Sequence, residues 1–151
     1  MDACPALDAG PGAQRLVAIT VAVVIVDQAA KRFGGLDAFH ANYANYAHMA
    51  VDTNPVDTPT GAYDDTMRSN ARGFFLCTKY AIPALLKRGG GTILYTSSEA
   101  AHVPFDVRVS YSMSKAAIHA LMRHVAVKWG PDNIRANVIA PGLIVTPKNA
   151  A

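Results

Sequence analysis

The sequence has little charge, few cysteines and no basic run. Only 17% of its 151 residues are charged, with 14 Lys plus Arg against 11 Asp plus Glu, so the formal net charge is +3. This small, scattered surplus excludes the concentrated basic surface of a nucleic-acid-binding protein. The two cysteines, Cys4 and Cys77, are too few for a disulfide framework and lack the spacing of a metal site. We therefore expect a reducing, cytoplasmic environment, no metal and no nucleic-acid partner.

Long apolar runs are also absent. The longest, Leu16–Val26, has about eleven residues, whereas a bilayer-spanning helix needs roughly 18. Arg15 precedes it as the positive charge of a secretion signal would. However, Asp2 and Asp8 lie in the region that such a signal keeps basic. We expect no membrane partner and interpret this run as a buried element.

The chain does contain enough apolar residues for one globular domain, because 51% of its residues are hydrophobic. Short apolar segments at residues 36–42, 92–96 and 134–140 are typical of buried strands. Apolar residues with helical spacing alternate with them over residues 62–87 and 110–129.

The N-terminal part is less regular. Residues 1–14 are rich in Ala, Pro and Gly without a period, which predicts a loose terminus. The β-branched residues of 16–26 favour a strand, but apolar residues from Val26 to Phe33 have helical spacing that ends at Gly34-Gly35. We predict a helix for this second part and leave the first part open.

Helices that alternate with short apolar strands are typical of a parallel sheet covered on both faces. We therefore predict an α/β fold with a doubly wound parallel sheet. In such sheets, ligands bind beyond the carboxyl ends of the strands. The residues at or directly after the ends of the three predicted strands are Asn42, Ser97-Ser98 and Pro141-Gly142.

One pair of side chains in the second long helix suits acid–base chemistry. Tyr111 and Lys115 are four residues apart, so they lie on one face of that helix. A free phenol has a pKa of about 10, and a nearby ammonium favours the phenolate and lowers that pKa. Ser98 precedes Tyr111 by thirteen residues and follows a buried strand, so its hydroxyl could face the same crevice. The alternative for the pair alone is an exposed helix pair.

Taken together, these residues resemble the short-chain dehydrogenase/reductase family over about Val26 to Pro147. The order and spacing of several segments agree with the family. They are Phe33-Gly34-Gly35-Leu36-Asp37, Asn70-Ala71-Arg72-Gly73, Thr96-Ser97-Ser98, Tyr111-Ser112-Met113-Ser114-Lys115, and Asn133-Ile134-Arg135-Ala136-Asn137 followed by Pro141-Gly142.

The resemblance implies an oxidoreductase that transfers hydride between the nicotinamide of NAD or NADP and a small-molecule alcohol or carbonyl substrate. Tyr111 would be the general acid and base, and Lys115 would lower its pKa while binding the nicotinamide ribose. Ser98 would orient the substrate oxygen, and Asn70 would support a water-linked proton path to Lys115. A homo-oligomer is implied for an intact protein. The cofactor-binding residues implied are Asn42, Tyr111, Lys115, Pro141, Gly142, Ile144 and Thr146.

The sequence departs from the family near both ends. The glycine-rich turn that receives the cofactor pyrophosphate has no match, because Gly10-Pro11-Gly12 has the wrong spacing. The family's Asn-Asn-Ala-Gly stretch is here Ala41-Asn42-Tyr43-Ala44, and its last segments have no counterpart after Thr146.

These departures predict an incomplete, Rossmann-like NAD(P)-binding domain at residues 26–151, after an irregular or non-homologous start at residues 1–25. We interpret the chain as a truncated or misread reading frame, and we expect little or no dehydrogenase activity from it alone. The strand that would distinguish NAD from NADP is missing, so the sequence does not indicate the preference.

The sequence leaves two other interpretations to compare with this one. The chain could be an inactive fragment that acts as a helix-mediated interaction module, although core packing also explains the apolar residues concerned. A metal site is disfavoured because His119 and His124 are five residues apart and so do not share a helix face. A phosphate-binding role for Gly89-Gly90-Gly91 is disfavoured because this run follows a helix and precedes a strand, the reverse of a phosphate loop. The residues that suggest the interaction module are Phe74, Phe75, Leu121, Met122 and Trp129.

Overall fold

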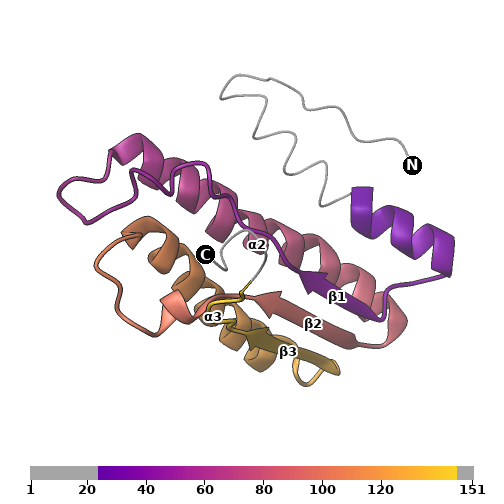
Figure 1. Cartoon of the computed structure of the whole chain (residues 1–151). Helices are drawn as coiled ribbons and strands as arrows, with labels where there is room; N and C mark the ends of the chain where they lie inside the picture. Colours follow the sequence, from indigo (N-terminus) through magenta and orange to yellow (C-terminus); the bar gives the residue numbers. More distant parts are fainter. Residues whose placement is uncertain (1–23, 146–151) are drawn as a thin grey trace.

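The computed structural model of the chain describes residues 24–145. Within that range, three parallel strands form one sheet in the order β1-β2-β3, as Figure 1 shows. A helix over residues 24–33 precedes the sheet. The elements that follow are β1 Ala38–Ala41, α2 Thr60–Arg88, β2 Gly91–Thr96, the short 3-10 helix η1 Glu99–Ala101, α3 Val109–Trp129 and β3 Ile134–Ile139.

The predicted alternation of strands and helices is confirmed, and each predicted boundary lies within two residues of the observed one. The strand expected at 36–42 is shorter, because Leu36 and Asp37 precede the paired residues of β1. The first part of the 16–26 run lies outside the described residues, whereas its last residues belong to the helix over 24–33.

Register places alternate side chains of the three strands on one face of the sheet. Phe39 pairs with Ile93, which pairs with Ala136. Two residues further along these strands, Ala41 pairs with Tyr95. These side chains form the core together with residues of α2 and α3. The fully buried apolar residues that the two helices contribute are Phe74, Ala81, Leu85, Ile118 and Val125.

Glycines end α2 and admit the next strand. Gly89 has a left-handed φ of 90°, and the Gly90 N–H donates to the Leu85 carbonyl at 3.0 Å, so orphan carbonyls of the last turn are satisfied. At Gly91, a Cβ would lie 2.4 Å from the Asp37 carbonyl oxygen. Only glycine therefore allows β2 to start beside β1 at this point. The predicted end of the first long helix at this glycine run is confirmed.

The expectation that helices cover both faces of the sheet is not met by the described residues. Both α2 and α3 pack on the face that carries Ile93 and Tyr95 (Figure 1). On the other face, Leu94 pairs with His40 on one side and with Asn137 on the other, and both of these partners are exposed. That face is largely polar, and residues 24–145 place no helix over it.

Core packing accounts for four of the five residues that suggested an interaction module. Phe74 is completely buried, and Leu121, Met122 and Trp129 pack against the core. Phe75 alone of the five is exposed, at 54%. Across residues 24–145 we also find no helix with the length and apolar content needed to cross a membrane.

Candidate active site

The three strands end at the same edge of the sheet, and a cavity of about 720 Å³ opens there. Asn42 follows β1, Ser98 follows β2 and Pro141 follows β3, and all three line the cavity. Tyr111 and Lys115 of α3 line it as well. Most of the predicted site residues therefore share one hollow at the position expected for a parallel sheet.

Lys115 is an almost completely buried cation, 2% exposed. Its Nζ donates to the Thr96 carbonyl at 3.0 Å and to the Tyr43 carbonyl at 3.3 Å. The Nζ also lies 5.1 Å from the centroid of the Phe74 ring. These contacts connect α3 with the carboxyl ends of β1 and β2. Burial lowers the pKa of Lys115 to about 8.

Tyr111 is 8% exposed, and its ring centroid lies 5.8 Å from the Lys115 Nζ. Burial raises its pKa to about 12, while the Ser98 hydroxyl acts in the opposite direction. Tyr46, whose ring centroid is 5.7 Å away, raises the pKa further, and the positive charge of Arg108 lowers it. The expected lowering of the Tyr111 pKa is therefore not present in this structure, because desolvation outweighs the Ser98 hydrogen bond and the Arg108 charge.

Ser98 and its neighbour Ser97 have different surroundings. Ser98 has an extended backbone at the start of η1, and its Oγ accepts from the Ala100 N–H at 3.3 Å while it faces the cavity. Ser97 is buried, and its Oγ donates to the Lys115 carbonyl at 3.0 Å. The end of β2 is thus bonded to α3 one residue before Ser98.

Asn70 lies behind the cavity rather than in its lining. Its side chain is completely buried in α2, where Oδ1 accepts from the Asn45 N–H at 2.8 Å and Nδ2 donates to Ser114 Oγ at 3.2 Å. Its carbonyl accepts from the Tyr43 hydroxyl at 3.2 Å. Asn70 therefore links the loop after β1 to the turn of α3 between Tyr111 and Lys115.

Tyr43, which departs from the family pattern, packs its ring on α2. The ring stacks on Phe74 with 4.8 Å between centroids, and the hydroxyl donates to the Ser69 carbonyl. Because the side chain is held there, the Tyr43 carbonyl remains available to Lys115 at the cavity.

Of the other residues predicted to bind the cofactor, Gly142 and Ile144 line the cavity, and Thr146 lies outside the described residues. A Cβ at Gly142 would lie 2.7 Å from Glu99 Oε2, so the carboxylate of Glu99 would have to move to admit a larger residue there. Sequence reasoning missed Glu99 and Arg108 in the lining. Arg108 precedes the first residue of α3 and has a left-handed backbone, so helical spacing gave no signal for it.

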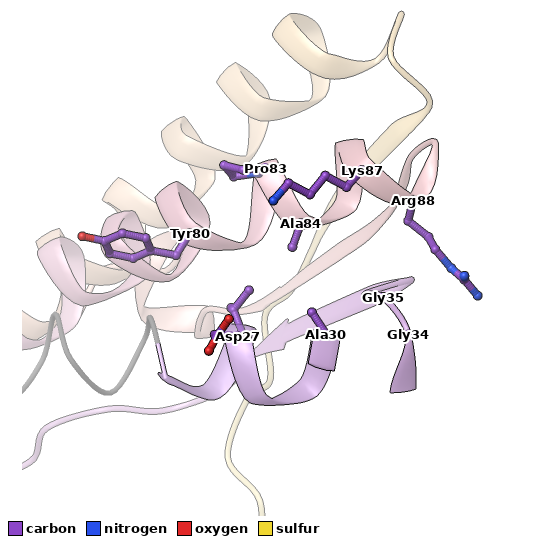
Figure 2. A pocket seen from close by; sticks show the side chains of 10 residues that line it. Asp27, Ala30, Gly34, Gly35, Tyr80, Pro83, Ala84, Lys87 and Arg88 are labelled. Carbon is purple, nitrogen blue, oxygen red and sulfur yellow. The ribbon is translucent and has the colours of Figure 1, made fainter. Parts of the chain in front are cut away.

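A second cavity, of about 350 Å³, lies between the helix over 24–33 and the last turns of α2 (Figure 2). Tyr80 and Ala84 line it from α2, and Ala30 lines it from the shorter helix. Figure 2 shows Arg88 pointing away from the rest of the lining, and its Nε donates to Asp37 at 2.9 Å. This hollow contains none of the predicted site residues.

The α/β sheet with a tyrosine, a lysine and a serine at its carboxyl edge is the arrangement that the resemblance to short-chain dehydrogenases/reductases predicts. The comparisons agree with this prediction. The family model described as enoyl-(acyl carrier protein) reductase matches residues 21–151. Dehydrogenase/reductase SDR family member 4 of Sus scrofa is 36% identical over 122 residues, which are 81% of this chain and 43% of that protein. The chain belongs to the short-chain dehydrogenase/reductase family.

Solved structures give the same result. The structure of NAD⁺-bound xylitol dehydrogenase has a TM-score of 0.78 and 27% identity, covering 86% of this chain and 49% of that one. A 7α-hydroxysteroid dehydrogenase complexed with NADH and 7-oxo glycochenodeoxycholic acid has a TM-score of 0.73 and 30% identity, covering 86% and 52%. The predicted Rossmann-like α/β class is confirmed, and the chain spans about half the length of these relatives.

Proposed function

We propose that this chain carries the catalytic part of an NAD(P)-dependent oxidoreductase that interconverts an alcohol and a carbonyl compound. The observation that carries the proposal is the meeting of Ser98, Tyr111 and Lys115 in one cavity beyond the carboxyl ends of the strands. Family membership supports it, as does the NAD⁺-bound xylitol dehydrogenase of similar fold.

The described residues suit the nicotinamide end of such a cofactor better than its pyrophosphate end. The cavity combines hydroxyl, amide and ammonium groups from Asn42, Ser98 and Lys115 with the space that Gly142 leaves beside Glu99. Within residues 24–145, none of the three strands is followed by a glycine-rich turn into a helix N-terminus. When bound, the nicotinamide would give or accept the hydride.

In the proposed reaction, the chain's own residues bind the substrate oxygen and move its proton. The Ser98 hydroxyl orients that oxygen, and the Tyr111 phenol gives the proton to it or takes the proton from it. Lys115 holds the nicotinamide ribose, and Asn42, Pro141, Gly142, Ile144 and Thr146 bind along the cofactor. The part of Asn70 in a proton path stays a prediction, as do the homo-oligomer and the cytoplasmic location.

The proposal is tested by calorimetric titration of the purified chain with NAD⁺, NADH, NADP⁺ and NADPH. We expect heat of binding for at least one nucleotide, but weak binding, because the described residues offer no pyrophosphate turn. Oxidation of the bound reduced nucleotide by 2,3-butanedione should be slow for the same reason, and this slow rate should fall about a hundredfold or more in Tyr111→Phe, since general acid catalysis contributes on the order of that factor.

The matched control is Tyr63→Phe, which changes a tyrosine in the first turn of α2 and should keep the wild-type rate. If none of the four nucleotides gives heat at millimolar concentration, the proposal is wrong for this chain. It is also wrong if Tyr111→Phe and Tyr63→Phe turn over equally.

A further inference from the structure

The helix that carries Tyr111 begins without a cap of its own. Arg108, at the N-cap position of α3, has a left-handed backbone with φ 68° and ψ 43°, and its side chain makes no cap hydrogen bond. The first turn contains no acidic residue. The first N–H groups of a helix need acceptors when they are buried, and Ser110 and Tyr111 are both buried. An acceptor must therefore come from elsewhere in the chain.

Asp52, in the loop between β1 and α2, supplies that acceptor. Its Oδ1 accepts from the Ser110 N–H and its Oδ2 from the Tyr111 N–H, each at 2.9 Å. Its carbonyl accepts from the Arg108 N–H at 2.7 Å. Asp52 thus accepts from three N–H groups around the start of α3, those of Arg108, Ser110 and Tyr111, although 58 residues separate Asp52 from Ser110.

The Asp52 carboxylate is buried, and no cation neutralises it among the described residues. Asp52 is 3% exposed, and within residues 24–145 it forms no ion pair. A buried carboxylate without a cation is costly unless strong donors surround it. Here the donors are two backbone N–H groups at the positive end of a helix, which favours a negative charge.

The geometry connects this carboxylate with the tyrosine. The Tyr111 N–H belongs to the same residue whose phenol faces the cavity, so the bond to Oδ2 fixes the backbone from which that phenol projects. The same loop brings the Tyr46 ring to 5.7 Å from the Tyr111 ring, and its Asn45 N–H is bonded to Asn70. The loop is therefore held on α2 while it holds α3.

We propose that Asp52 is the positioning residue of Tyr111, a long-range cap that sets the first turn of α3 so that the phenol lies at the cavity beside Ser98. Left-handed residues other than glycine are uncommon, and Arg108 keeps this conformation next to the bonded turn. The catalytic consequence rests on the proposed function, whereas the positioning itself does not.

The test compares Asp52→Ala and Asp52→Asn with Asp106→Ala, which removes an exposed aspartate from the loop before α3. Two NMR measurements on the whole chain report on positioning without activity. They are the hydrogen-exchange rates of the Ser110 and Tyr111 amides and the ring resonances of Tyr111, which are assigned by their loss in Tyr111→Phe.

In Asp52→Ala, we expect both amides to exchange about tenfold faster, because a lost helix cap is worth a factor of that order. The Ile118 amide in the middle of α3 should change much less. The Tyr111 ring resonances should shift while those of Tyr63 stay. Asp52→Asn keeps one acceptor oxygen, so it should protect one of the two amides and give a smaller ring shift. Asp106→Ala should match the wild type.

Amide exchange in Asp52→Ala within twofold of the wild type would overturn the cap. Faster exchange with an unmoved Tyr111 ring would overturn the positioning of the side chain. If Asp52→Ala is too unstable to study, Asp52→Asn decides both points. In an active chain, kcat per folded molecule should fall at least tenfold in Asp52→Ala with a nearly unchanged KM for NADH. An inactive wild type would count against the proposed function and leave the NMR outcomes decisive for Asp52.

Discussion

At the scale of single residues, Lys115 shows how the site balances a buried charge. Its ammonium faces two backbone carbonyls and the Phe74 ring, and within residues 24–145 it forms no ion pair. Carbonyl dipoles and an aromatic face replace only part of the lost hydration, so burial lowers the pKa to about 8. The residue therefore remains mostly charged at neutral pH but close to the range where it loses its proton.

This lowered pKa predicts a pH-dependent stability. The ordinary pKa of a lysine is 10.5, so between about pH 8 and that value the unfolded chain binds more protons than the folded one. The free energy of unfolding should then rise as pH increases through this window, by about 2 kcal/mol between pH 8 and pH 10. Lys115→Met removes the group and should remove this rise. Urea unfolding at pH 7, 8, 9 and 10 measures the difference.

The matched control is Lys128→Met, an exposed lysine in the last turn of α3, which should keep the rise. The buried tyrosines do not confuse the comparison below pH 10. Burial raises the pKa of Tyr95 and of Tyr111 from 10.0 to about 12, so their contribution to stability is lost only as pH rises above 10. Burial also raises the pKa of Tyr43 and of the Cys77 thiol, and the contribution of Cys77 is lost as pH rises above its ordinary value of 9.0. The wild type and both lysine variants share these groups, so their effect cancels in the comparison. Equal pH profiles for Lys115→Met and the wild type would contradict the prediction.

At the scale of elements, a glycine in α2 makes room for the loop after β1. A Cβ at Gly73 would lie 1.4 Å from the Tyr43 hydroxyl oxygen, so the two residues cannot both be large. The Tyr43 ring stacks on Phe74 and its hydroxyl bonds the carbonyls of Ser69 and Asn70. The glycine that weakens α2 as a helix thereby allows the contact that holds the loop on it.

This contact predicts a reversal of sign in a double-mutant cycle. Gly73→Ala alone should lower the free energy of unfolding by about 1–3 kcal/mol, because the methyl group displaces the Tyr43 ring. In a Tyr43→Ala background, the same change should raise it by about 0.5–1 kcal/mol, since alanine favours a helix interior. Denaturant unfolding of the four proteins measures both changes in the free energy of unfolding.

The control is Gly61→Ala, where a Cβ meets nothing within 4 Å, and it should change the free energy of unfolding equally in both backgrounds. An equal effect of Gly73→Ala in both backgrounds would exclude the contact.

The elements were predictable from local sequence, whereas several site contacts were not. The apolar run of β2 and the helix stop at Gly89 depend on neighbours along the chain, so spacing alone located them. The bond from Asp52 to Tyr111 and the bond from Asn70 to Ser114 span 59 and 44 residues. An aspartate among Thr, Asn and Pro residues has the same local pattern as any surface turn. Its role as a cap depends on a tertiary contact that no local period encodes.

At the scale of the whole molecule, the described part of the chain has a sheet with two unlike faces. Ile93 is completely buried under α2 and α3, whereas its neighbour Leu94 points to the face where His40 and Asn137 are exposed. On that face, His40 Nε2 lies 2.9 Å from Thr96 Oγ1, and an Arg135 N–H donates to Thr92 Oγ1 at 3.3 Å. Parallel sheets are ordinarily buried on both faces, and the strands then have few polar residues. The polar side chains here instead suit contact with water.

Two adjacent substitutions therefore should differ in their effect on stability. Ile93→Ala removes side-chain volume from the covered face and should lower the free energy of unfolding by about 2–5 kcal/mol. Leu94→Ala removes similar volume from the other face and should cost about 1 kcal/mol or less, because part of that side chain is already exposed. If Ile93→Ala does not fold, Ile93→Val should still cost about 0.5–1.5 kcal/mol. Denaturant unfolding at two protein concentrations measures these differences.

Two results would show that the second face is covered in solution. If Leu94→Ala lowers the free energy of unfolding as much as Ile93→Ala does at both concentrations, the chain itself covers this face. If the effect of Leu94→Ala grows with protein concentration, a second copy covers it. Either result would contradict the prediction, because only a face open to water makes the leucine dispensable.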